Sequence, residues 1–189
     1  MEGGGVKPGN GCLKAVAALA ALALAGCGNE DYIRFAETEG VYVDVGDLTY
    51  QVQISRYLNP GNLDDREYLE GIPEAQLHPP GDEIWFGIFM RVKNYSDVPS
   101  VPSSDYTITD TEGNEYRPIA LPDNNPFAYH PGTLGPSQVY PYAEGAAANG
   151  PIQGSLILFK LKTDSLQNRP LVLKISQAGE EPSRVDLDL

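Results

Sequence analysis

The sequence predicts an all-β fold, an antiparallel β-sandwich of about seven strands. Three observations support this prediction. Apolar and polar residues alternate in several short segments, which is the pattern of a strand with one buried face. Gly, Pro, Asn and Asp separate these segments, as in turns. After Cys27, no stretch keeps apolar residues at helical spacing for three turns. An up-and-down barrel is the alternative arrangement.

The first two predicted strands cover residues 48–57 and 84–94. In the first strand, alternation places four apolar side chains on one face: Leu48, Tyr50, Val52 and Ile54. The second strand is apolar on one face and partly apolar on the other, because Trp85 and Phe89 interrupt its polar side. We therefore expect the second strand to be central in its sheet, with Trp85 as a candidate for the core.

The remaining strands follow at short intervals. Residues 106–109 and 115–118 flank a turn cluster at 110–114, which predicts a hairpin because Gly113 or Asn114 can take a positive φ. Three further strands are expected in the C-terminal part of the chain, at residues 154–162, 171–176 and 185–189. A short helical turn is expected at residues 64–69.

The first 26 residues have the order of a secretory signal peptide. Lys7 and Lys14 make the start of the chain positive. An uninterrupted apolar run follows at residues 15–25, which is shorter than the roughly 20 residues that a membrane-spanning helix needs. A buried core helix is the alternative, but this run lacks the polar stripe expected of one.

Four residues end this segment: Leu24, Ala25, Gly26 and Cys27. Together they resemble the lipobox of bacterial lipoproteins. The resemblance implies cleavage after Gly26 and a diacylglycerol on the Cys27 thiol. The expected organisation is a signal peptide at 1–26, a lipidated tether at 27–40 and the β-domain at 41–189. The protein would then be lipid-anchored at the extracytoplasmic face of a cell membrane.

Charge limits the partners that the chain can bind. The formal net charge is −13, and removal of residues 1–26 would leave 11 basic and 25 acidic residues, a net charge of −14. An acidic excess of this size repels nucleic acid and anionic lipid headgroups. We therefore expect attachment to the membrane through lipid alone and no nucleic-acid partner. Solubility near a crowded surface explains the acidity more simply than cation binding.

Several segments resemble a known group of bacterial lipoproteins, those with a telokin-like, immunoglobulin-like domain of unknown function. The resemblance rests on a Tyr-rich first strand at 48–59, the stretch 85–96, the hairpin at 110–113 and the strand at 154–161. It implies an immunoglobulin-like β-sandwich and a location, and it carries over no catalytic residues. The segments 59–82 and 121–151 are longer than the usual loops of such domains.

The sequence gives no pattern that indicates catalysis or a resident metal. It lacks the G-x-S-x-G motif of serine hydrolases. His78 and His130 each precede a proline in a predicted loop. Acidic residues gather in one loop segment, where a weak calcium site is the alternative to a solvated loop: Asp64, Asp65, Glu67 and Glu70, with Asp82 and Glu83 further on. We predict no catalytic residues, no metal ligands and no cofactor.

Four aromatic residues lie in a proline-stiffened region: Phe127, Tyr129, Tyr140 and Tyr142. Aromatic side chains on a stiff loop make good contact surfaces, because they lose little conformational entropy on binding. The sequence therefore predicts a candidate binding loop. The alternative is that these rings fold back and cover one end of the sandwich.

The function expected from the sequence is that of a lipid-anchored extracytoplasmic binding or adaptor domain without catalytic activity. Its partner, a protein or an envelope component, is not written in the sequence. Two other functions remain open at this point. One is a surface hydrolase that uses loop carboxylates, and it requires two converging acids, one with a raised pKa. The other is a purely structural envelope lipoprotein.

Overall fold

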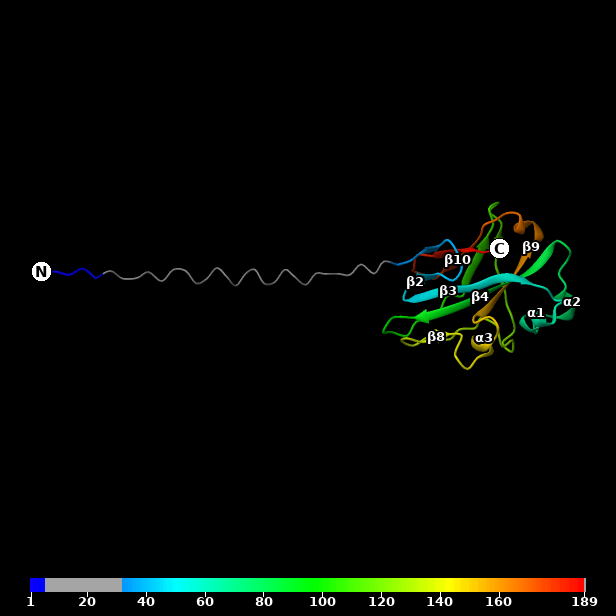
Figure 1. Cartoon of the computed structure of the whole chain (residues 1–189), viewed down its shortest axis with the longest axis horizontal. Helices are drawn as coiled ribbons and strands as arrows, with labels where there is room; N and C mark the ends of the chain where they lie inside the picture. The colour runs from blue at the N-terminus through cyan, green and yellow to red at the C-terminus, as the bar shows by residue number, and fades with distance from the viewer. Residues whose placement is uncertain (6–31, 189) are drawn as a thin grey trace. The chain divides into compact units, whose positions relative to one another are not determined.

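Two β-sheets pack against each other in the computed structural model (Figure 1). The structure describes residues 1–5 and 32–188. Most of the expected signal peptide, from residue 6 on, and the lipobox-like residues Leu24, Ala25, Gly26 and Cys27 lie outside the described residues. The compact β unit begins at Tyr32.

The larger sheet has six strands and is antiparallel throughout. Five strands lie in the order β2 (Tyr42–Val45), β3 (Leu48–Leu58), β4 (Glu83–Asn94), β9 (Ser155–Lys162) and β7 (Pro118–Ile119). The sixth strand, β8 (Val139–Tyr140), pairs with Val92 and Lys93 near the C-terminal end of β4. As the sequence predicts, β4 is central.

The smaller sheet has five strands, in the order β1 (Phe35–Ala36), β11 (Ser183–Leu187), β10 (Leu171–Ser176), β5 (Asp105–Thr109) and β6 (Glu115–Tyr116). β1 runs parallel to β11, and the other pairs are antiparallel. Of the eleven strands in the described residues, seven have four or more residues. The predicted all-β antiparallel sandwich is therefore confirmed, including the hairpin of β5 and β6.

Helical structure is short among the described residues. It consists of α1 (Leu63–Tyr68), α2 (Glu74–Leu77), α3 (Ala146–Asn149) and a 3₁₀ turn at Thr163–Leu166. α1 confirms the expected helical turn, and the Asn62 side chain caps it by accepting hydrogen bonds from the backbone N–H groups of Asp64 and Asp65. In the part of the chain that is described, no helix has the length and hydropathy needed to cross a membrane.

The main core lies between the sheets and follows the alternation of the strands. Tyr50, Phe86, Ile108 and Phe159 are among its fully buried side chains. The sequence prediction that Ile54 joins Val52 on this face is wrong. A β-bulge shifts the register between these two residues, so Ile54 lies opposite Phe89 on the outer face of the larger sheet.

A second core covers the outer face of the larger sheet. Two long segments, 59–82 and 121–151, fold over β4 and β9 and bury Trp85, Phe89 and Leu158. Trp85 is thus buried, but in this second core and not between the sheets. Its indole Nε1 donates a hydrogen bond to the Leu77 carbonyl at 2.8 Å. The smaller sheet covers one face of β4 and the two long segments cover the other, which explains why β4 is apolar on both faces.

One buried amide joins the two covering segments. The Asn125 Nδ2 atom donates to the carbonyl oxygens of Tyr68 and Glu70, both at 3.0 Å. The Asn125 Oδ1 atom accepts a hydrogen bond from the Phe127 backbone N–H at 2.9 Å. Since Asn125 is buried, these bonds satisfy polar groups that would otherwise destabilise the layer.

The sandwich extends further toward the N-terminus than the sequence indicates. The expected tether, 27–40, includes β1, whose Ala36 is buried opposite Val185. Glu39 also belongs to the fold, because its carboxylate accepts hydrogen bonds from the backbone N–H and hydroxyl of Ser55. These residues looked like a tether because their contacts are long-range and leave no alternation in the local sequence.

The packing of the two covering segments can be tested at Gly71. Gly71 has φ +86°, and a Cβ there would lie 2.2 Å from Pro122 Cγ in the other segment. Gly113 has φ +84° with no atom nearby, so Gly113→Ala measures the backbone cost alone, about 1 kcal/mol. Because of the contact with Pro122, we expect Gly71→Ala to lower the free energy of unfolding by roughly 1–3 kcal/mol more than Gly113→Ala does. Urea denaturation measures both changes, and equal losses would contradict the contact.

Candidate functional site

Three of the four aromatic residues in the predicted binding loop pack into the fold. Tyr140 is buried, Tyr129 is half-buried against the main core, and Phe127 is half-buried against the second core. Tyr142 is 41 % exposed. The covering role left open by the sequence therefore describes Phe127, Tyr129 and Tyr140, and of the four residues only Tyr142 is exposed.

The tyrosines form a row of edge-to-face contacts from the core to the surface. Tyr106 contacts Tyr129, Tyr129 contacts Tyr140, and Tyr140 contacts Tyr142, with ring centroids 5.5, 5.6 and 5.3 Å apart. Phe127 lies apart from this row and packs edge-to-face on Tyr68, with ring centroids 4.8 Å apart. Edge-to-face packing is favourable for aromatic rings. The four predicted residues thus divide between two cores.

The hydroxyls of Tyr106 and Tyr129, together with that of Tyr50, meet at Ser103. The Tyr106 hydroxyl donates to the Ser103 carbonyl at 3.0 Å and lies 2.7 Å from the Tyr129 hydroxyl. The Tyr50 hydroxyl accepts a hydrogen bond from the Ser103 backbone N–H at 2.8 Å. Burial raises the pKa of Tyr50 to about 12 and raises the pKa values of Tyr106 and Tyr129 well above the usual value. These hydroxyls stay protonated at neutral pH and act as structural hydrogen-bonding groups.

An apolar cavity of about 210 Å³ opens beside the buried tyrosines. Its lining includes Tyr106, Ile119, Leu121, Tyr129 and Leu158. It lies where β7 pairs with one part of β9 and where Ala128 bridges to Leu156 further along the same strand. Sequence reasoning missed this site, because its walls come from four separate segments of the chain. The only local signal was the break of alternation at Pro118.

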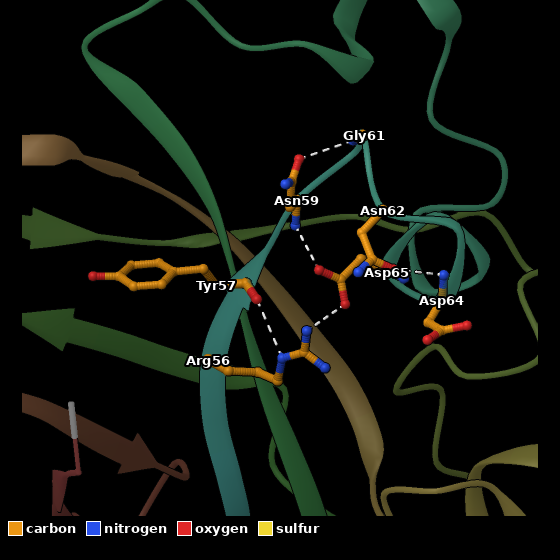
Figure 2. Close-up of polar contacts among 7 residues, drawn as sticks. All are labelled: Arg56, Tyr57, Asn59, Gly61, Asn62, Asp64 and Asp65. Atoms are coloured by element: carbon orange, nitrogen blue, oxygen red, sulfur yellow. Dashed lines mark hydrogen bonds and ion pairs between the residues drawn. The ribbon is translucent and has the colours of Figure 1, made fainter.

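An ion pair helps to organise the acidic loop. The Asp65 carboxylate is buried, pairs with the Arg56 guanidinium and accepts the Asn59 backbone N–H at 2.8 Å (Figure 2). Asp64 contributes its backbone N–H to the Asn62 cap, and its carboxylate points away from Asp65 (Figure 2). Asp65 therefore fixes the start of the first covering segment onto β3.

Two further acidic residues, Asp82 and Asp110, are also engaged in local structure. Asp82 pairs with Lys162 at 2.7 Å, and that hydrogen bond lowers the pKa of Asp82. Burial acts to raise the pKa of Asp110, but hydrogen bonds from Asn114 and from the Glu112 N–H outweigh it and lower this pKa. Asp110 closes the hairpin turn. Across residues 1–5 and 32–188, no three His, Cys, Asp or Glu side chains gather in a metal-binding group.

Two carboxyls have raised pKa values among the described residues. Burial raises the pKa of Glu39, although hydrogen bonds from Ser55 oppose the shift. Burial and the charge of Glu37 raise the pKa of Asp186. Asp186 lies in β11, Glu39 accepts a hydrogen bond from Asp188 just after it, and neither carboxyl lines the apolar cavity.

Comparison with known proteins gives a likeness of fold only. No protein-family model matches the chain, and no curated protein matches it. The YjhA protein of Bacillus subtilis shares 11 % identity over 80 % of this chain and 99 % of that chain, with a TM-score of 0.45. An uncharacterized β-sandwich protein of Clostridium difficile shares 9 % identity over 81 % of this chain and 95 % of that chain, with a TM-score of 0.42. Similarity at this level carries no information about activity or partner.

The ion pair at Asp65 gives a test of how the acidic loop is held. Asp65→Ala leaves the Arg56 guanidinium and the Asn59 N–H without their acceptor, so we expect a loss of roughly 1–3 kcal/mol in the free energy of unfolding. Asp64→Ala, at the exposed neighbour, should change it by about 0.5 kcal/mol or less. Chemical denaturation compares the two variants. Equal effects would show that Asp65 is no more important than a surface carboxylate.

Proposed function

We propose that this protein is a lipid-anchored, extracytoplasmic β-sandwich domain that acts by binding a protein or another envelope component and does not catalyse a reaction. Kinship with lipoproteins that carry a telokin-like, immunoglobulin-like domain is part of this proposal. The observation that carries it is the lipobox-like sequence from Leu24 to Cys27, which ends five residues before the folded unit begins at Tyr32.

The anchor and the fold support each other in this proposal. A short apolar run followed by a modifiable cysteine is the order of a lipoprotein signal, and a diacylglycerol holds a protein stably on a membrane. Cys12 lies ahead of the proposed cleavage site, so the exported domain would contain no disulfide. Two cores, one between the sheets and one outside them, give a domain of this size enough buried surface to be stable without one.

The apolar cavity is the feature that best supports recognition. Ile119 is 38 % exposed at the cavity, and Tyr129 and His130 connect it to the predicted binding loop. A partly open apolar hollow with a few polar groups at its edge is typical of a site that receives one apolar group of a partner. We assign the binding role to this hollow and to the neighbouring part of the loop. The sequence, by contrast, predicts that the four aromatic rings form the binding surface.

A hydrolytic function has less support from the geometry. It requires two carboxyls that converge on a shared hollow, one of them with a raised pKa. Glu39 has the raised pKa, but its carboxylate is held by Ser55 and by the Asp188 backbone N–H. Its hydrogen bonds join β3 to the end of β11, which is a structural task.

The anchoring part of the proposal is tested at the two cysteines. Cys27→Ala removes the only thiol at the proposed cleavage site, so we expect loss of incorporated radiolabelled palmitate and loss of firm membrane association. Cys12→Ala is the matched control and should keep both, because Cys12 lies within the removed segment. Metabolic labelling with membrane fractionation measures the outcome. Palmitate retained by Cys27→Ala would contradict the anchor.

The binding part is tested at the cavity. Ile119→Glu places a charge at the hollow, whereas Leu63→Glu places one on a side chain that is 80 % exposed in α1. In affinity capture from native membranes, we expect Ile119→Glu to weaken the affinity for the partner about thirtyfold, which corresponds to the loss of a roughly 2 kcal/mol contact. Leu63→Glu should retain the wild-type affinity. Thermal melting shows whether each variant folds. A wild-type protein that captures nothing would support a purely structural role instead.

A further inference from the structure

The remaining apolar surface of the domain is concentrated at one end. Seven large apolar side chains in residues 32–188 are at least 48 % exposed, and six of them belong to only two segments. These six are Tyr32, Ile33 and Phe35 in the first segment and Tyr95, Val98 and Val101 in the loop after β4. The seventh, Leu63, lies in α1. Exposed apolar side chains gathered in this way mark a contact surface.

Strand pairing brings the two segments to the same end of the sandwich. Ile33 pairs with Asp44 of β2, through a backbone hydrogen bond of 2.8 Å and a side-chain hydrogen bond of 2.9 Å. β2 turns into β3 at Val45 and Leu48, and Leu48 lies opposite Asn94, the last residue of β4. Two strand spacings, about 10 Å, therefore separate Val45 from Asn94. We call this the entry end, since the chain enters the sandwich here.

Both segments have a fixed backbone beneath their exposed side chains. Arg34 accepts a hydrogen bond at its carbonyl from the Arg184 N–H at 2.9 Å, and its guanidinium donates to the carbonyls of Asp44 and Glu181. In the loop, Asn94 Nδ2 donates to the Val98 carbonyl at 2.7 Å. The apolar side chains are thus presented on ordered backbone, which lowers the entropic cost of a contact.

The short stretch of chain between Cys27 and Tyr32 limits how far the entry end can be from a lipid on Cys27. Tyr32 is the fifth residue after Cys27, so these two residues can be at most roughly 18 Å apart. β3, with 11 residues, is about 36 Å long. The connection is therefore shorter than the sandwich, and the entry end stays nearer to a lipid on Cys27 than the opposite end with α1 and α2.

We propose that the entry end, formed by Tyr32, Ile33, Tyr95, Val98 and Val101, lies against the interfacial region of the lipid bilayer that holds the anchor. This inference rests on the proposed lipidation of Cys27. Tyrosine suits a membrane interface, because its ring is apolar and its hydroxyl stays hydrated. The contact orients the domain so that the opposite end, where α1 and α2 follow β3, points away from the membrane.

The charges at this end determine which lipid it accepts. Asp47, Asp97, Glu180 and Glu181 are exposed here. The cations Arg34 and Lys93 are engaged by Glu181 and by the Tyr95 ring, with Lys93 Nζ 3.8 Å from the ring centroid. An acidic surface of this kind is repelled by anionic headgroups. The contact is therefore with zwitterionic lipid, and anionic lipid weakens it.

The test uses the mature lipidated protein in phosphatidylcholine vesicles, with a nitroxide label on one new cysteine. Cys27 is blocked by lipid and Cys12 is removed with the signal, so Val98→Cys and Leu63→Cys each supply one free thiol. We expect collisions of the Val98 label with a water-soluble nickel chelate to fall several-fold relative to those of the Leu63 label. The triple change Tyr32→Ser, Ile33→Ser and Tyr95→Ser should restore them, while the protein still floats with the vesicles.

Each other result overturns a defined part of the inference. If the protein floats and both labels meet the chelate equally, the entry end does not touch lipid. If spin–spin broadening of the Val98 label grows with protein density, a second copy of the chain covers this end instead. If addition of phosphatidylglycerol strengthens the protection, the charge argument is wrong. If the unlabelled wild-type protein fails to float, the lipid anchor itself is refuted, and the inference fails with it.

Discussion

The structure depends on the need to bury both faces of β4. Phe86 and Ile88 point to one face and Trp85 and Phe89 to the other, and all four are almost completely buried. Each such side chain left in water would cost about 1.5–3 kcal/mol. The smaller sheet covers only one face. The other face needs a further layer, and the two long segments between strands provide it.

This second layer has little regular structure of its own, so polar contacts fix it in place. Asp65 joins its first segment to β3 (Figure 2). Asn125 joins its second segment to the first. Both side chains are buried and fully engaged, as buried polar groups must be for the layer to be stable. The acidic loop and the aromatic loop, which look like surface features in the sequence, are consequently parts of the architecture.

The burial of both faces of β4 also determines where apolar surface remains exposed. Once both faces of the larger sheet are covered, exposed apolar residues persist at the entry end and beside the cavity. These two places differ in chemistry. The entry end is a set of protruding side chains among acids, whereas the cavity is a hollow lined by buried rings. In the proposed function, the entry end would face a membrane and the hollow would receive a partner.

The sequence by itself determined the sandwich, its main strands, the hairpin and the α1 turn, because alternation and turn residues are local signals. It also predicts a lipobox at Leu24 to Cys27, a stretch outside the described residues, and this stays a prediction. The tertiary structure alone decided that Ile54 turns outward, that Trp85 belongs to a second core, and that Phe127, Tyr129 and Tyr140 pack inward. It alone revealed the cavity and the entry end. These features depend on contacts between residues far apart in the chain, and such contacts leave no period in the sequence.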